Sequence, residues 1–131
     1  MPKKSSYEGL QNQVRKLKTP KIDVWQNQYP DKEYMISMKA LEFTCICPKT
    51  GLPDFAKVNL QYMPNRFCVE LKSFKLYLNF FRNIGIFHEH VINRILDDFV
   101  KSCKPRFLRI EGEFNIRGGI QTTVSAIYKE K

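Results

Sequence analysis

The chain has 131 residues, of which 43% are hydrophobic and 27% are charged, and its formal net charge is +9. This length predicts one domain with its own hydrophobic core, and no apolar run approaches the roughly 18 residues that cross a bilayer. The basic N-terminus has no apolar stretch behind it, which argues against a secretory signal. A cytoplasmic protein with reduced cysteines is therefore expected.

Residues 1–30 are polar and contain prolines at positions 2, 20 and 30, which predicts little regular structure beyond a short helix around residues 8–17. Residues 1–22 carry six lysine or arginine side chains against one acid, Glu8. Such a segment suits nucleic acid, an acidic membrane or a polyphosphate, but a solvated tail is commoner and is favoured here. We expect a partly disordered basic arm over residues 1–30 and one domain over residues 31–131.

Two strands are expected in the first half of the domain. Residues 33–43 mix apolar and polar side chains as a strand does, and Ala40-Leu41 breaks the alternation as a β-bulge would. The segment Cys47–Phe55 predicts a loop, because it contains two prolines and a glycine. Residues 56–62 alternate cleanly and predict a half-buried strand, which is followed by a short extended return over Arg66–Glu70.

From residue 71 onward the apolar spacing becomes helical. One helix is predicted over residues 71–82, ended by Asn83 and Gly85, and a second over residues 87–103, ended by Pro105. The apolar positions that define them are Leu71, Phe74, Leu78 and Phe81 in the first helix and Ile92, Ile95, Leu96, Phe99, Val100 and Cys103 in the second.

Two more strands are predicted at the C-terminal end of the chain. Residues 108–116 and 120–129 alternate again, and Gly118-Gly119 predicts the turn of a hairpin between them. The order strand, strand, helix, helix, strand, strand predicts an α+β domain whose antiparallel sheet carries two helices on one face. Pairing between subunits would remove the open sheet edges, so an oligomer is expected.

Cys47 and Asp54 are the candidate catalytic residues. They lie seven positions apart on the rigid loop, so both can reach one small substrate. A thiol can attack an electrophilic carbon, and a carboxylic acid can donate the proton that completes the addition. The neighbouring Lys49 would favour the thiolate. The alternatives are a small buried apolar cysteine at 47 and a turn-forming aspartate at 54.

The other three cysteines are interpreted as structural. Cys45-x-Cys47 is too tight for the usual spacing of zinc ligands, and no metal site is predicted. Cys68 and Cys103 lie among apolar residues, so they are expected in the core rather than in disulfides.

Three further segments carry side chains suited to binding. Glu70–Tyr77 opens the first predicted helix, where Lys72 and Lys75 share one face near an N-terminus that favours anions. His88-Glu89 opens the second helix and suits the recognition of a nitrogen heterocycle. Arg117-Gly118-Gly119 places a cation on a flexible turn. Taken singly, each segment can also be explained as a solvated lysine pair, helix-start chemistry or a plain hairpin.

In one known family, four segments occur in this order and spacing: Cys47–Phe55, Glu70–Tyr77, His88-Glu89 and Arg117-Gly118-Gly119. Over roughly residues 33–128 the chain resembles the NADPH-dependent 7-cyano-7-deazaguanine reductases of queuosine biosynthesis, the QueF-type nitrile reductases, in their short single-module form. Glu70–Tyr77 fits the family's signature octapeptide at every position, with Leu71 as an accepted variant. In the Cys47–Phe55 segment, Leu52 departs from the family pattern, because many relatives carry glutamine at that position. The basic arm is not part of the family pattern.

The resemblance implies a tunnelling fold, in which subunits assemble their sheets into a barrel, usually as a decamer of two stacked pentamers. The ligand would then lie at subunit interfaces. The implied reaction reduces the nitrile of 7-cyano-7-deazaguanine to an aminomethyl group with NADPH, and no membrane or direct nucleic-acid partner is implied.

The resemblance also implies a role for each site residue. Cys47 would add to the nitrile carbon to give a covalent thioimide, and Asp54 would protonate the nitrile nitrogen. The implied binding residues are Val69, Glu70, Leu71, His88 and Glu89 for the deazaguanine, and Lys72, Ser73, Lys75, Arg117 and Gly118 for NADPH. No Rossmann glycine fingerprint is present, so composition alone does not indicate a nicotinamide enzyme.

Three other functions remain open at this point. The related archaeal amidinotransferase acts on the same nitrile in tRNA and would use Cys47 and Asp54 without NADPH. The intact Glu70–Tyr77 segment argues against it, because that segment serves the cofactor in the family. A zinc cyclohydrolase of the same fold lacks its ligand set here. A non-catalytic nucleic-acid-binding module would leave the pairing of Cys47 with Asp54 unexplained.

Overall fold

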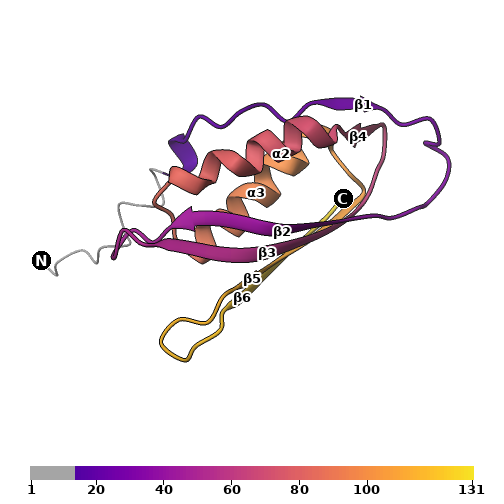
Figure 1. The fold of residues 1–131 in the computed structure, drawn as a ribbon. Helices are drawn as coiled ribbons and strands as arrows, with labels where there is room; N and C mark the ends of the chain where they lie inside the picture. The colour runs from indigo at the N-terminus through magenta and orange to yellow at the C-terminus, as the bar shows by residue number, and fades with distance from the viewer. Residues whose placement is uncertain (1–13) are drawn as a thin grey trace, which may run out of the picture.

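The computed structural model describes residues 14–131, and a four-stranded antiparallel sheet forms its centre (Figure 1). The sheet order is β2-β3-β5-β6, and a separate two-stranded sheet pairs β1 with β4. The elements are β1 (Val24–Gln26), β2 (Ile36–Ile46), β3 (Pro53–Met63), β4 (Phe67–Val69), α2 (Leu71–Phe80), a 3-10 turn (Phe81–Asn83), α3 (His88–Cys103), β5 (Phe107–Phe114) and β6 (Thr123–Lys129).

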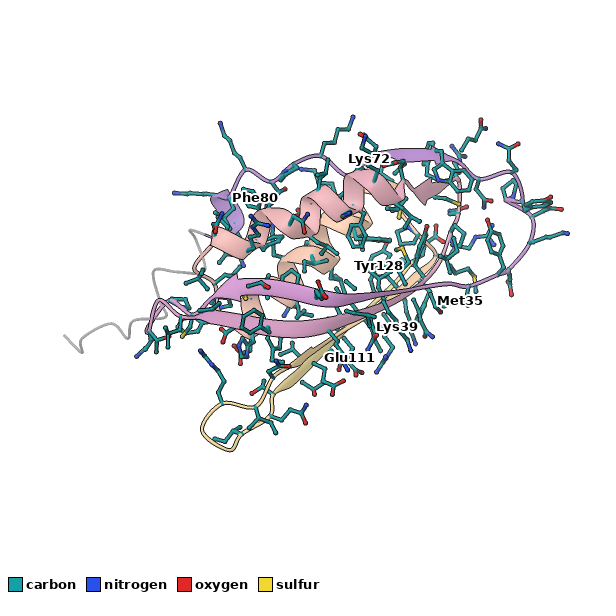
Figure 2. All side chains as sticks on the ribbon, in the orientation of Figure 1. Met35, Lys39, Lys72, Phe80, Glu111 and Tyr128 are labelled. Atoms are coloured by element: carbon teal, nitrogen blue, oxygen red, sulfur yellow. The ribbon has the colours of Figure 1, made fainter. Side chains whose placement is uncertain are left out.

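Both helices cover one face of the sheet, as the sequence predicts (Figure 1). In β3 every second side chain from Ala56 to Tyr62 is buried under the helices, because strand side chains alternate between faces. The opposite face is mostly polar, although Phe55 and Ile127 are exposed on it. Lys39 and Glu111 lie on this face, while Tyr128 points toward the helices (Figure 2). The bulge expected at Ala40-Leu41 is confirmed by a register shift between Ala40 and Phe43.

Helix α3 packs closely on β5 at Gly112. A Cβ atom at this position would lie 2.4 Å from Ile92 Cδ1, so a larger residue would force the Ile92 side chain or the helix to shift. Ile92, Ile95, Phe99 and Cys103 of α3 are fully buried, which confirms the predicted apolar face. No helix in residues 14–131 is long and apolar enough to cross a membrane.

Several predicted boundaries shift. The loop covers residues 47–52 rather than 47–55, because Pro53 to Phe55 already pair with β2. Helix α2 ends at Phe80, where a 3-10 turn tightens the backbone, instead of continuing to residue 82. The predicted turn at Gly118-Gly119 is confirmed, because Arg117 and Ile120 exchange backbone hydrogen bonds across it. The flanking strands are shorter than predicted, since β5 ends at Phe114 and β6 begins at Thr123.

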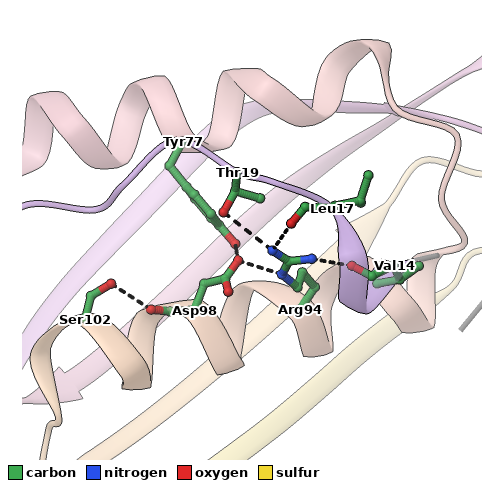
Figure 3. A network of polar contacts seen from close by, with 7 residues as sticks. All are labelled: Val14, Leu17, Thr19, Tyr77, Arg94, Asp98 and Ser102. Carbon is green, nitrogen blue, oxygen red and sulfur yellow. Dashed lines mark hydrogen bonds and ion pairs between the residues drawn. The ribbon is translucent and has the colours of Figure 1, made fainter. Parts of the chain in front are cut away.

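The short helix predicted around residues 8–17 lies partly outside the described residues. Within the described part, positions 14–16 are helical. Beyond it, residues 17–26 run over α2 toward β1 (Figure 1). Arg94 of α3 donates hydrogen bonds to the carbonyl oxygens of Val14 and Leu17 (Figure 3). Further along the segment, Ile22 is buried. This part of the basic segment therefore rests against the domain.

Candidate active site

Asp54 occupies an inward-facing position at the start of β3. It continues the buried series of that strand and is only 4% exposed, although it carries a carboxylate. Its partner across the sheet is Cys45 of β2, whose side chain is also buried. Burying a carboxylate costs free energy unless the charge is paired or hydrogen-bonded. Asp54 therefore needs cationic or hydrogen-bonding neighbours.

Two side chains from distant segments contact the Asp54 carboxylate. Asp54 Oδ2 lies 3.1 Å from Nε2 of His88, the first residue of α3. Asp54 Oδ1 lies 2.7 Å from Nη1 of Arg117, on the hairpin between β5 and β6. The His88 ring also stacks on Phe114 of β5, with centroids 3.7 Å apart and planes 8° apart. Each carboxylate oxygen therefore has one of these two side chains beside it, and the Arg117 contact is an ion pair in which Oδ1 accepts no hydrogen bond from residues 14–131.

Cys47 begins the loop that joins β2 to β3. The loop is closed by hydrogen bonds from Cys47 N to Leu52 O and from Gly51 N to Cys47 O, each 2.9 Å long. Gly51 has φ of 71°, a conformation that favours glycine. Just before the loop, Ile46 exchanges backbone hydrogen bonds with the segment 84–86, which leads into α3. This bridge holds the cysteine loop beside the start of the helix that carries His88.

The surroundings of Cys47 favour its thiolate. A hydrogen bond from the Thr50 side chain is the largest cause that lowers the pKa of the Cys47 thiol, and backbone hydrogen bonds from Thr50 and Lys49 act in the same direction. Partial burial and the negative charge of Asp54 oppose them. By contrast, burial raises the pKa of Cys45 to about 12 and that of Cys103 to about 12. Among these thiols, Cys47 is the one suited to act as a nucleophile.

These groups together can perform covalent addition to an electrophilic carbon. Cys47 is half-buried, and Asp54 is near enough to influence its ionisation. A proton that leaves the thiol can pass to the carboxylate and then to a substrate atom that gains electron density. The structure thus brings together Cys47, Asp54, His88 and Arg117 of the predicted site residues.

The Glu70 segment lies elsewhere in the chain. Glu70 caps α2, because its carboxylate accepts hydrogen bonds from the backbone N–H groups of Lys72 and Ser73 at 3.1 and 2.6 Å. These bonds, the Ser73 N–H first, lower the pKa of Glu70. The Ser73 hydroxyl donates to Glu70 O and accepts from Asp23 N, at 2.9 and 2.8 Å. Lys72 and Lys75 are exposed.

Helix α2 separates this segment from the cysteine loop. Glu70 precedes its first residue, whereas the 3-10 turn and His88 follow its last, and ten helical residues span about 15 Å. A groove of about 730 Å³ between β2 and α2 has Leu71 and Lys75 in its wall but not Cys47 or His88. One chain therefore does not gather all the predicted site residues.

The remaining predicted residues have simple local environments. Val69 is buried and its N–H donates to the Tyr62 hydroxyl at 3.0 Å, while Leu71 is 65% exposed. Glu89 is exposed in the first turn of α3, directly after His88. Gly118 has φ of 58° at the tip of the exposed hairpin.

Sequence reasoning missed two residues of this site, Thr50 and Phe114. Thr50 could have been found from its place in a tight loop three residues after the candidate nucleophile, where a hydroxyl can turn back toward the thiol. Phe114 reads as an ordinary core aromatic, and no signal in the sequence shows that an imidazole stacks on it. The inward position of Asp54 could also have been read by extending the alternation of residues 56–62 backward by one step.

The fold and the site define an α+β protein with a half-buried free cysteine, whose pKa is lowered, near a buried aspartate that is paired with His88 and Arg117. The profile of the QueF-like protein family matches residues 53–131. The chain is 53% identical over 109 residues to the NADPH-dependent 7-cyano-7-deazaguanine reductase of Nitrosococcus oceani, which covers 83% of this chain and 84% of that protein. It is also 53% identical over 113 residues to the reductase of the same name from Chloroherpeton thalassium, and this match covers 86% of this chain and 97% of that protein. The chain belongs to the QueF-like family.

A solved structure has the same fold. The crystal structure of the archaeosine synthase QueF-Like in its apo form matches with a TM-score of 0.69, covering 74% of this chain and 95% of that one. Sequence identity is 18%, so this likeness concerns the fold alone.

Proposed function

We propose that the protein reduces the nitrile of 7-cyano-7-deazaguanine to the aminomethyl group of 7-aminomethyl-7-deazaguanine with NADPH. The observation that carries this proposal is the low-pKa thiol of Cys47 beside the buried Asp54, in a chain about half identical to reductases of that name. A nitrile carbon is the kind of electrophile that a thiolate attacks, and its nitrogen needs a proton as the addition proceeds.

The covalent step uses Cys47 and Asp54. The Cys47 sulfur forms a bond to the nitrile carbon, one π bond of the nitrile breaks, and the proton of the thiol passes through Asp54 to the nitrogen. The product is a thioimide, which accepts hydride far better than the free nitrile. NADPH supplies the hydride when bound, and two equivalents complete the four-electron reduction to the amine. His88 holds Asp54 in place from the α3 side.

The proposed binding residues form two groups. Val69, Glu70, Leu71, His88 and Glu89 would hold the deazaguanine, whose ring N–H groups need carboxylate acceptors. The exposed cations Lys72 and Lys75, with Ser73, Arg117 and Gly118, would hold NADPH. Lys72 and Lys75 fit this role, since they are three residues apart and exposed near the start of α2. The Ser73 hydroxyl is already hydrogen-bonded, so its part in holding NADPH would be indirect, by fixing the helix start from which Lys72 and Lys75 extend.

A second copy of the chain would complete the site. Support comes from the separation of Glu70 and Cys47 along α2, and from β2 and β6, which are the edge strands of the sheet in residues 14–131. Edge pairing between copies is the barrel assembly of the tunnelling fold, and a decamer of two pentamers is its usual form. A cytoplasmic location without a direct nucleic-acid partner completes the proposal.

The test mixes purified protein, NADPH and 7-cyano-7-deazaguanine and follows the near-ultraviolet absorbance of NADPH. Consumption of two NADPH per nitrile, with the amine identified by mass, supports the reductase. A Cys47 adduct without NADPH consumption would instead favour an amidinotransferase that acts on the nitrile in tRNA. Neither signal would contradict both functions.

A further inference from the structure

Each oxygen of the Asp54 carboxylate has one basic side chain beside it in this structure. Oδ1 is in ion-pair contact with Arg117 at 2.7 Å and Oδ2 with His88 at 3.1 Å, and the residue is almost fully buried. A group that passes a proton to a substrate atom must come within about 2.6–3.2 Å of that atom. One of the two contacts therefore has to open before the nitrile nitrogen can reach the carboxyl group.

The two partners differ in how firmly they are held. His88 is fixed by the backbone of α3 and by its stack on Phe114. Arg117 has a side chain that is 39% exposed, and its other contact is a weak hydrogen bond of 3.4 Å to Pro53 O. It is followed by Gly118 and Gly119, which have positive φ and open space where a Cβ would stand. The contact that can open at low cost is the one with Arg117.

The groups around Asp54 come from four segments: Cys45 on β2, Cys47 on the loop, His88 on α3 and Arg117 on the hairpin. Arg117 is the permanent cation among them. Its side chain is also the more exposed of the two that contact the carboxylate, at 39% against 19% for His88. Arg117 therefore covers Asp54 on the side from which a substrate can approach.

We infer that Arg117 is a positioning residue that covers the Asp54 carboxylate in the unliganded protein. Its guanidinium must move away from that carboxylate before Cys47 can add to the nitrile. This inference rests on the proposed function. When Arg117 leaves, the thiol proton moves to Asp54, the sulfur–carbon bond forms as a nitrile π bond breaks, and the proton passes to nitrogen. No oxidant or reductant is needed for this step. The released guanidinium is then free to meet an anionic group of NADPH.

The test measures formation of the Cys47 adduct by intact mass, with 7-cyano-7-deazaguanine and without NADPH, from acid to alkaline pH. Arg117→Gln removes the charge, Arg117→Lys restores it, and Arg109→Gln removes a matched arginine that pairs with Glu111 on the sheet. We expect about tenfold faster adduct formation in Arg117→Gln, because the ion pair with Asp54 no longer has to open. Arg117→Lys should return toward the wild-type profile, and Arg109→Gln should not differ from it.

The direction of the effect separates this role from simpler ones. A residue that only holds NADPH, or only stabilises the hairpin, would leave the adduct rate unchanged or lower it. An unchanged or lower rate in Arg117→Gln, with wild-type adduct formation intact, would overturn the inference and leave the proposed function standing. No adduct in the wild type or in any variant would overturn the proposed function, and the inference with it.

Discussion

The imidazole of His88 and the carboxylate of Asp54 meet with Nε2 3.1 Å from Oδ2, although the residues are 34 positions apart. The contact joins the first residue of α3 to the second residue of β3, and the stack of His88 on Phe114 adds β5. Three elements of the core thus orient one acid. Because Asp54 is held so firmly, its role in proton transfer can be tested by a substitution that keeps its shape.

Asp54→Asn should still bind 7-cyano-7-deazaguanine but form the Cys47 adduct slowly, if at all. An amide cannot take the thiol proton and pass it to the nitrile nitrogen, while its size preserves the packing beside Cys45. Calorimetry measures binding, and intact mass measures the adduct. Adduct formation at the wild-type rate would remove Asp54 from the proton-transfer role.

Cys47 should be the thiol that iodoacetamide labels fastest in the native protein. Cys45, Cys68 and Cys103 are buried, and burial raises the pKa values of Cys45 and Cys103, whereas Cys47 is half-buried with a lowered pKa. Peptide mapping after brief labelling checks this order. Cys47→Ala should lose the fast label, the nitrile adduct and turnover while it keeps the oligomer. Cys103→Ala is the matched control and should keep the fast label.

Thr50→Val should move the alkylation of Cys47 to higher pH. The Thr50 side-chain hydrogen bond stabilises the thiolate, so its loss raises the pKa of Cys47 and leaves less thiolate at neutral pH. The readout is the iodoacetamide rate at Cys47 as a function of pH. Thr50→Ser keeps the hydroxyl and should follow the wild-type curve. Superimposable curves for Thr50→Val and wild type would show that the hydroxyl does not act on the thiolate.

Local patterns predicted most of the fold. Strict alternation fixed the inner face of β3, helical spacing located α3 within one residue, and the interrupted pattern at Ala40-Leu41 marked the bulge. Each of these signals depends on neighbours within one element, where side-chain periodicity follows directly from backbone geometry. The same loop that carries Cys47 was recognisable from its prolines and glycine.

The parts that sequence reasoning missed depend on distant pairs. β1 is a strand because Val24 to Gln26 pair with β4, more than 40 residues away, and three residues carry no periodic signal. The pairing of Arg117 with Asp54 joins positions 63 apart and depends on residue 115 lying against β3, where Asn115 N donates to Phe55 O. From sequence alone, Arg117 is predicted to be a cation on a flexible turn. That prediction does not say that its partner is Asp54.

Replacing Lys72 and Lys75 together with alanine should raise the KM for NADPH and spare nitrile binding. Both ammonium groups are exposed near the start of α2, where they would neutralise phosphate charge, and neither is bonded to the Cys47 site. Initial rates against NADPH concentration give KM, and adduct formation without NADPH gives nitrile binding. The control replaces Lys101 and Lys104, at the end of α3, with alanine. An unchanged KM in the Lys72/Lys75 variant would place the cofactor elsewhere.

Arg94→Met should loosen the N-terminal segment and lower the free energy of unfolding by about 2 kcal/mol. Arg94 donates to the carbonyl oxygens of Val14 and Leu17, and its Nε lies 2.8 Å from Asp98 Oδ2 (Figure 3). Asp98 also accepts from the buried Tyr77 hydroxyl, so the substitution leaves a half-satisfied cluster.

Limited trypsin digestion and chemical denaturation together check this prediction for Arg94→Met. Arg15, Lys16 and Lys18 are already exposed, and release of the segment frees its backbone to enter the protease, so cleavage there should be faster than in the wild type. Arg82→Met is the matched control, because Arg82 is exposed in the 3-10 turn, and its substitution should change the free energy of unfolding by less than about 0.5 kcal/mol. Equal cleavage rates in Arg94→Met and wild type would mean that Arg94 does not hold residues 14–19 on the domain.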